Sequence, residues 1–116
     1  MANYFSRDEF KCPCCREVRA SGWLMHLLNK VREAYGKPMI VNSGYRCDKH
    51  NKEIGGSSNS AHLRGLAVDI KCETSADRFL LLSLFYSVGF KRIGAYDKWI
   101  HVDVDESLSQ KVLWLQ

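Results

Sequence analysis

The segment RIGAYDKWIHVDV, residues 92–104, contains two short apolar runs separated by Asp97 and Lys98. Two such runs joined by a two-residue turn are typical of a β-hairpin, so we expect strands over residues 92–96 and 99–104. A third run, GLAVDIK at residues 65–71, alternates apolar and polar side chains as a half-buried strand does. These three strands predict a sheet with one apolar face and one polar face.

Two amphipathic helices are expected in addition to these strands. The first is capped by Ser21 and ends at Gly36, and its apolar stripe consists of Trp23, Leu24, Leu27, Leu28, Val31, Ala34 and Tyr35. The second spans residues 75–88 before Gly89, and its inward-facing side chains are predicted to be Phe79, Leu82, Leu84, Phe85 and Tyr86. Residues 39–42 are expected to form a short strand, and residues 46–60 a surface loop with one helical turn over residues 48–53.

This mixture of helices and strands lacks a regular βαβ alternation. It therefore favours an α+β fold, with an antiparallel sheet and flanking helices, over a doubly wound fold. The chain has 116 residues, 46% of them hydrophobic and 26% charged, which suits a single domain over residues 1–116 and excludes a disordered chain. We expect a monomer whose one site is shallow or lies at an edge.

The charge pattern and the terminal sequence limit the possible partners. The chain carries 17 Lys and Arg against 13 Asp and Glu, and the net charge of +4 suits an acidic partner. The basic residues are scattered among acidic ones, so nucleic-acid binding is not expected. The longest apolar stretch, residues 79–85, is far shorter than the ~20 residues that span a bilayer, so membrane insertion is not expected either. The first residues, MANYFSRDEFKC, show no secretory signal, which predicts synthesis in the cytoplasm.

Histidines and aspartates gather on the predicted polar face. Asp69 points away from the core of its strand, and His101 and Asp103 do so in the last strand. Together with His62 they offer two imidazoles and a carboxylate, the three-ligand set of a catalytic zinc that keeps a fourth position for water. Asp103 and Asp97 are nearby carboxylates that can take a proton from that water. Spacing alone leaves a second interpretation open, in which these side chains are solvated and bind nothing.

The five cysteines are an odd number, which argues against a closed disulfide framework. Cys12 and Cys15 have the C-x-x-C spacing of zinc ligands, and Cys47, His50 or Cys72 would complete such a site. The sequence contains no second C-x-x-C motif, and buried free thiols are the alternative. Whether a second, structural zinc binds near Cys12 and Cys15 is therefore left open.

Two segments carry a resemblance to a known family: SGYRCDKHNKEIGGSSNSAHLRGLAVDI at residues 43–70 and GFKRIGAYDKWIHVDVD at residues 89–105. They resemble the zinc-dependent D-Ala-D-Ala carboxypeptidase family of peptidoglycan peptidases, especially its small phage-endolysin-like and C-terminal-domain members. FSRDEFKC at residues 5–12 and REAYGKPMIV at residues 32–41 resemble the N-terminal part of that group. The motif S-x-H-x-x-G-x-A-x-D at residues 60–69 is specific, and the resemblance implies a hedgehog/DD-peptidase-like fold.

The resemblance also implies roles for individual residues. His62, Asp69 and His101 match the zinc ligands of the family. Arg46 matches a residue that meets the carboxylate of the substrate, a role that suits a guanidinium fork. Ser60 matches the serine of the S-x-H motif, which contacts the substrate or the ligands; a loop-capping hydroxyl is the other interpretation.

The chain departs from the better-studied members of the family at two positions. Lys98 stands three residues before the last histidine, where those members place an acidic catalytic residue, and Ala61 replaces the usual Gln before the first ligand. The small members have an H-x-D pattern that Asp103 matches. Asp103 is therefore the preferred general base, or else a residue that orients the ligands, and Asp97 is the alternative base.

The function implied by the resemblance is a zinc peptidase with one catalytic ion. It would hydrolyse amide bonds in peptidoglycan stem peptides as a D-Ala-D-Ala carboxypeptidase or endopeptidase, as a phage-type lysin that reaches the cell wall during host cell lysis. A catalytically silent zinc-containing binding module of the same fold remains an alternative because of Lys98. A zinc-containing nucleic-acid module built on the cysteines is disfavoured by the scattered basic charge.

Overall fold

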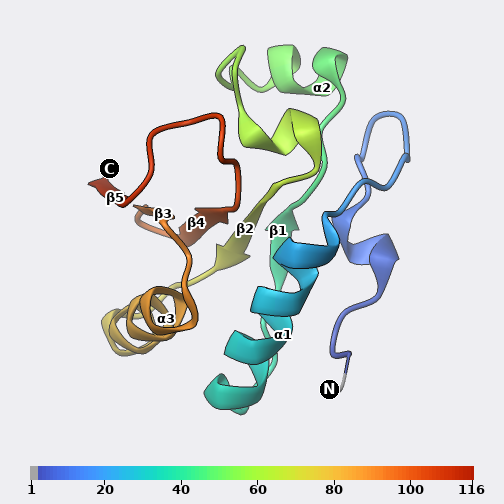
Figure 1. Ribbon diagram of the computed structural model, residues 1–116. Coiled ribbons are helices and arrows are strands. Elements are labelled where there is room, and N and C mark those ends of the chain that lie inside the picture. Colours follow the sequence, from blue (N-terminus) through green and yellow to red (C-terminus); the bar gives the residue numbers. More distant parts are fainter. Residues whose placement is uncertain (1–2) are drawn as a thin grey trace.

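The computed structural model describes residues 3–116, which form a five-stranded sheet with helices on its faces (Figure 1). The helices are α1 (Gly22–Tyr35), α2 (Asp48–Glu53) and α3 (Ser75–Val88), with the 3-10 helices η1 (Arg7–Phe10) and η2 (Ala61–Arg64). The strands lie in the order β1 (Val41–Ser43), β2 (Ala67–Lys71), β4 (Trp99–Asp103), β3 (Arg92–Ala95) and β5 (Val112–Leu115). The predicted α+β class is confirmed, and the sheet is mostly antiparallel, with one parallel pair of strands.

The predicted hairpin of β3 and β4 lies at the centre of the sheet, and β2 lies next to β4 on the side opposite β3. The antiparallel register between β2 and β4 pairs Asp69 with His101. Because side chains alternate along a strand, the same register places four buried aliphatic side chains on the opposite face: Val68, Ile70, Ile100 and Val102. The first strand is shifted from its expected place, since β1 covers residues 41–43 and not 39–42.

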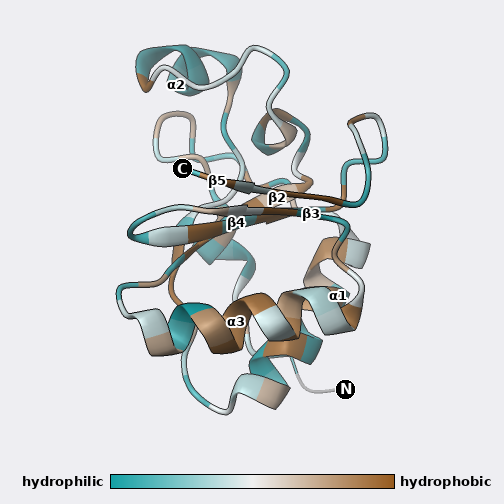
Figure 2. Cartoon of the chain, turned by 90° about the vertical axis from the view of Figure 1, so that its left-hand side faces the viewer, coloured by the Kyte–Doolittle hydropathy of each residue, from teal (hydrophilic) through white to brown (hydrophobic). Residues whose placement is uncertain are grey.

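Helices α1 and α3 cover the apolar face of the sheet, while α2 and several loops lie on the other face (Figure 2). Helix α1 begins after Ser21, whose hydroxyl accepts a hydrogen bond from the Leu24 N–H, and ends at Gly36 in the left-handed conformation. The side chains that α1 and α3 bury in the core are Leu24, Leu27, Leu28, Val31, Leu81 and Phe85. The core thus lies between helices and sheet, and the polar face is free to carry a site.

Helix α3 packs differently from the prediction. Phe79 and Tyr86, which were expected to point inward, are 77% and 76% exposed, whereas Leu81 and Phe85 are buried. Phe79 and Tyr86 are seven residues apart and share one helix face, which points away from the sheet. Trp23 of the predicted α1 stripe is also exposed. Apart from such exposed members, the predicted face of α1 is the buried one, whereas α3 is apolar on more than one side, so periodicity alone does not select its buried face. Among residues 3–116, no helix has the length and apolar composition needed to cross a bilayer.

Strand β5 is not indicated by the sequence, and it makes the sheet mixed. It pairs in parallel with β3 and places Trp114 beside Gly94. A Cβ atom at Gly94 would contact the Trp114 ring at less than 3 Å, so only glycine leaves room for the ring over this strand. Gly94 also pairs with His101 in β4. Trp114 therefore lies next to the predicted metal ligands.

Candidate metal centre

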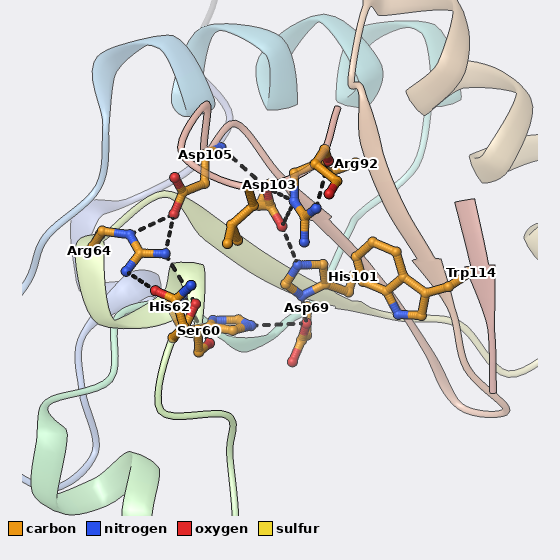
Figure 3. Close-up of polar contacts among 12 residues, drawn as sticks. Ser60, His62, Arg64, Asp69, Arg92, His101, Asp103, Asp105 and Trp114 are labelled. Carbon is orange, nitrogen blue, oxygen red and sulfur yellow. Dashed lines mark hydrogen bonds and ion pairs between the residues drawn. The ribbon is translucent and has the colours of Figure 1, made fainter. Parts of the chain in front are cut away.

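His62, Asp69 and His101 come together on the polar face of the sheet (Figure 3). Asp69 and His101 are paired residues of the adjacent strands β2 and β4. His62 reaches them from η2, which Ser60 caps by accepting a hydrogen bond from the His62 N–H at 3.2 Å. All three residues are buried. The structure thus brings the three predicted metal ligands into one group.

The distances within this group suit a metal ion. Asp69 Oδ1 lies 3.2 Å from His62 Nε2 and 3.0 Å from His101 Nδ1, and the three ligand atoms lie within 4.8 Å of one another. A tetrahedral zinc with bonds of about 2.0–2.1 Å separates neighbouring ligand atoms by about 3.3–3.4 Å. Two imidazoles and a carboxylate at these distances therefore fit zinc after only small movements.

The outer ring nitrogens determine which atoms face the centre of the group. His62 Nδ1 lies 2.7 Å from the Gly44 carbonyl oxygen, which can only accept, so this nitrogen carries a proton. His101 Nε2 donates to Asp103 Oδ2 at 2.7 Å. In the neutral imidazoles, the lone pairs of His62 Nε2 and His101 Nδ1 then face Asp69 Oδ1. Three acceptors converge with no proton among them, which favours a cation, and such outer hydrogen bonds are typical of histidine metal ligands.

A proton and a metal ion compete for this position. Burial raises the pKa of Asp69, but its contacts with the His101 and His62 imidazoles hold it well below its usual range. Burial lowers the pKa of His101, but the Asp103 and Asp69 carboxylates outweigh burial and raise it. In the metal-free chain these carboxylates favour a protonated His101, whose Nδ1 proton then occupies the place of a metal bond.

Asp103 lies behind His101, at the ring nitrogen that faces away from Asp69 (Figure 3). Its side chain is fully buried and both of its oxygens are engaged. Arg92 Nε donates to them at 2.8 and 3.1 Å, and the Asp105 N–H donates to Oδ1 at 3.1 Å. A carboxylate with these partners is placed to orient His101 and to increase its basicity.

Asp97, the alternative base, is exposed in the two-residue turn between β3 and β4. The turn is closed by a hydrogen bond from the Tyr96 N–H to the Trp99 carbonyl at 3.0 Å. Arg78 Nη2 also donates to the Asp97 carbonyl at 2.5 Å. Tyr96 and Trp99 line the cleft beside the metal centre. Asp97 lies between them in the chain but is not one of the residues that line the cleft.

Three side chains, one of them that of Asp69, accept hydrogen bonds from the Arg46 guanidinium and hold it in place. Its Nε donates to Ser43 Oγ at 3.1 Å, its Nη1 to Asn51 Oδ1 at 3.2 Å, and its Nη2 to Asp69 Oδ2 at 3.3 Å. Asn51 is itself fixed, because its amide donates to the Ser57 carbonyl at 2.8 Å. Burial lowers the pKa of Arg46, and the Asp69 charge opposes this effect. A guanidinium has five N–H donors, so two remain for a ligand in the cleft that Arg46 lines.

Ser60 and Arg64 stabilise the segment that presents His62. The Ser60 hydroxyl has the capping role described above and also lines the cleft. Arg64 Nε donates to Asp105 Oδ2 at 2.6 Å, and its two Nη atoms donate to the side chain and the carbonyl of Asn59 at 3.1 Å. These bonds tie η2 to the loop that follows β4.

An open cleft of about 560 Å³ adjoins the three predicted ligands. Trp99 and Tyr96 are stacked on one wall, with ring centroids 4.6 Å apart. Trp114 extends this wall by donating from Nε1 to Tyr96 Oη at 2.9 Å, and Arg92 lies over the Trp114 ring at 5.2 Å. The cleft therefore offers flat aromatic surfaces and the guanidinium groups of Arg46 and Arg92 beside the metal centre.

Three further residues of this site are not among those expected from the sequence. Arg92 pairs with Asp103 across the hairpin, and the alternation of side chains along both strands is the sequence signal that indicates this contact. Asn51 resembles an exposed helix residue in the sequence, yet it is 1% exposed. Trp114 reaches the site through a parallel strand pairing for which the local sequence contains no signal.

Comparisons with known proteins connect this geometry to a family. The sequence profile of the peptidase M15 family matches residues 3–103, a range that includes all three ligand candidates. A stretch of 47 residues is 45% identical to the zinc D-Ala-D-Ala carboxypeptidase of Streptomyces albus G. The stretch covers 40% of this chain and 18% of that enzyme, so the chain matches less than a fifth of the length of this relative.

Proposed function

The chain belongs to the peptidase M15 family, and from this premise we propose that it is a zinc peptidase that hydrolyses amide bonds in peptidoglycan stem peptides. The observation that carries the proposal is the convergence of three acceptor atoms, from His62, Asp69 and His101, at distances that suit zinc. Similarity to a zinc D-Ala-D-Ala carboxypeptidase supports the substrate class. The sequence resemblance to phage-endolysin-like members supports a phage-type lysin as the biological role.

In this proposal the residues of the site have separate roles. His62, Asp69 and His101 would hold a zinc ion, which would supply Lewis acidity toward the scissile carbonyl and make water acidic enough to act as the nucleophile near neutral pH. Asp103 keeps His101 Nδ1 directed at the ion by accepting the proton of Nε2. Arg46 offers its two remaining N–H groups to a carboxylate of the stem peptide.

Hydrolysis also needs a group that takes a proton from water and gives it to the leaving amine. Asp103 is fully buried with both oxygens engaged, so we assign it the positioning of His101. The proton transfer is assigned to Asp97, the exposed carboxylate in the turn beside the cleft-lining Tyr96 and Trp99. Asp97 does not need to contact the metal ligands before substrate binds, because catalytic contacts often tighten only when substrate binds.

The proposal is tested with a defined stem peptide that ends in D-Ala-D-Ala and with intact peptidoglycan, with products identified by mass spectrometry. Zinc-loaded protein is expected to cleave amide bonds in one or both substrates, a chelator is expected to abolish cleavage, and added zinc to restore it. His62→Ala and His101→Ala are expected to lose the zinc ion of this site and hydrolysis together. His26→Ala changes a histidine of α1 outside the site and serves as the matched control.

Full zinc content and full hydrolysis in either ligand variant would refute the proposed mechanism. Stoichiometric zinc binding without cleavage of any peptidoglycan fragment would instead identify the chain as a catalytically silent binding module. Asp97→Asn addresses the proton transfer separately, because it is expected to lower kcat while the zinc content stays that of the unaltered protein.

A further inference from the structure

A second group of potential metal ligands lies apart from the cleft. The thiol sulfurs of Cys12, Cys15 and Cys47 lie within 4.8 Å of one another. Cys12 and Cys15 come from the turn after η1, whereas Cys47 caps α2, and Cys12 and Cys47 are 35 residues apart in the chain. Of the other predicted partners, Cys72 packs in the hydrophobic core. His50 meets the Cys47 sulfur through its backbone N–H at 3.5 Å.

The turn after η1 is built around the Cys12 sulfur. The Arg16 N–H donates to the Cys12 carbonyl at 2.8 Å and closes the turn, and the Cys47 N–H donates to Cys12 Sγ at 3.4 Å. Backbone N–H groups directed at a sulfur favour the thiolate, which is the form that binds metals.

Cys14 lies between Cys12 and Cys15 in the same turn and offers a fourth thiol beside this group. A disulfide would engage only two sulfurs, whereas here three converge from both segments, and all four cysteines are free. Four thiolates in a tetrahedral arrangement are a standard ligand set of structural zinc sites.

From the convergence of Cys12, Cys15 and Cys47 we infer that these residues bind a second zinc ion, which has a structural role and takes Cys14 of the same turn as its fourth ligand. The chemistry of the ligands selects a soft, four-coordinate divalent metal, and zinc satisfies this preference without redox activity. The inference is independent of the proposed peptidase function, because it concerns different ligands and a different ion.

The position of this ion indicates what it stabilises. Cys47 directly follows Arg46, and the neighbouring Tyr45 N–H donates to the Phe10 carbonyl at 2.9 Å. A Cβ atom at Gly44 would lie 2.6 Å from Phe10 Cα, so the N-terminal segment and the β1–α2 loop are in close contact here. Zinc bound by thiols of both segments holds this contact and thereby the backbone that presents Arg46 to the cleft.

Cobalt(II) substitution distinguishes the two metal sites. Thiolate ligands give cobalt an intense charge-transfer absorption in the near ultraviolet, which nitrogen and carboxylate ligands do not give. The double variant His62→Ala/His101→Ala, loaded with cobalt under reducing conditions, is expected to keep this absorption because it retains the cysteine ligands. Cys47→Ser and Cys15→Ser in that background are expected to lose it, and Cys72→Ala, which changes a thiol in the core, is expected to keep it.

Zinc content provides the second measurement. The unaltered protein is expected to hold two zinc ions per chain, and Cys15→Ser, which changes an exposed residue and is therefore expected to fold, is expected to hold one. Absence of the thiolate absorption in the cobalt-loaded double variant would overturn the inference. So would an unchanged zinc content in Cys15→Ser, or a metal-free disulfide among these cysteines in protein prepared under reducing conditions. Loss of peptidase activity with the thiolate absorption intact would affect only the proposed function.

Discussion

Replacement of Asp103 by asparagine tests how the candidate metal centre is held together. Asp103→Asn keeps the shape of the side chain but removes its charge and one of its two acceptor oxygens. In the structure, Oδ2 accepts from His101 Nε2 at 2.7 Å, and both oxygens accept from Arg92 Nε. An amide can accept from His101 or from Arg92 with its one oxygen, while its NH2 group faces the other donor. The substitution therefore weakens His101 as a ligand and leaves Arg92 without its counter-ion.

Two magnitudes follow from these contacts. Loss of an orienting carboxylate behind a metal-binding histidine typically weakens metal binding about 10–100-fold, which corresponds to about 1.4–2.7 kcal/mol. Removing one partner of a buried ion pair costs about 3–5 kcal/mol of unfolding free energy. Arg92 keeps a hydrogen bond to the Ser109 carbonyl at 2.7 Å and is 14% exposed, so we expect a loss of about 2–3 kcal/mol, below the usual range.

The assays separate a positioning role of Asp103 from a catalytic one. Zinc affinity is measured by competition with a chromophoric chelator, stability by urea denaturation, and hydrolysis with the same stem peptide at limiting and at excess zinc. Asp103→Asn is expected to bind zinc more weakly and to recover most of its hydrolysis at excess zinc, while Asp97→Asn keeps the original zinc affinity. Unchanged zinc affinity combined with lost hydrolysis at saturating zinc would show that Asp103 itself transfers the proton, and would refute the positioning role.

Gly94→Ala is expected to lower the free energy of unfolding by about 1–3 kcal/mol, because its new Cβ overlaps the Trp114 ring; urea denaturation measures the loss, and an unchanged midpoint would contradict this packing. Phe85→Ala is expected to cost about 3–5 kcal/mol and Phe79→Ala no more than about 0.5 kcal/mol, since the first side chain is buried and the second exposed. Equal losses would contradict the assigned faces of α3. Zinc binding at the two-histidine site is expected to weaken as the pH falls, because the neighbouring carboxylates raise the pKa of His101 and zinc must displace the proton that they favour. Chelator competition over a range of pH measures this effect, and a pH-independent affinity would argue against this ligand set.

The arrangement of the metal ligands follows from patterns that are local in the sequence. The two-residue turn fixes the register of the hairpin, and the period of two puts Asp69 on the polar face of β2 and His101 on that of β4. The observed pairing of Asp69 with His101 then brings both residues together. His62 is less predictable, because its position depends on a short 3-10 helix that one Ser60 hydrogen bond caps, and such a helix has no apolar period.

Features that depend on contacts between distant segments could not be predicted in this way. Phe79 and Phe85 are both large and apolar and belong to the same helix, and only the position of the sheet decides that Phe85 is buried. Trp114 reaches the cleft because β5 returns parallel to β3, after a loop that follows β4. The convergence of Cys12 with Cys47 likewise depends on how the N-terminal segment crosses the β1–α2 loop.

The net charge of +4 is not concentrated around the candidate centre. Three arginine–aspartate pairs surround the site and are each neutral as a unit: Arg46–Asp69, Arg92–Asp103 and Arg64–Asp105. The metal-free cleft is therefore not strongly cationic, and basic residues elsewhere are largely screened beyond about 8 Å at physiological salt. A zinc ion adds two positive charges at the point where Asp69 is already paired with Arg46. In the proposed function, an acidic stem peptide is attracted to the cleft by the metal and by the free N–H groups of Arg46. The net charge of the chain contributes little to this attraction.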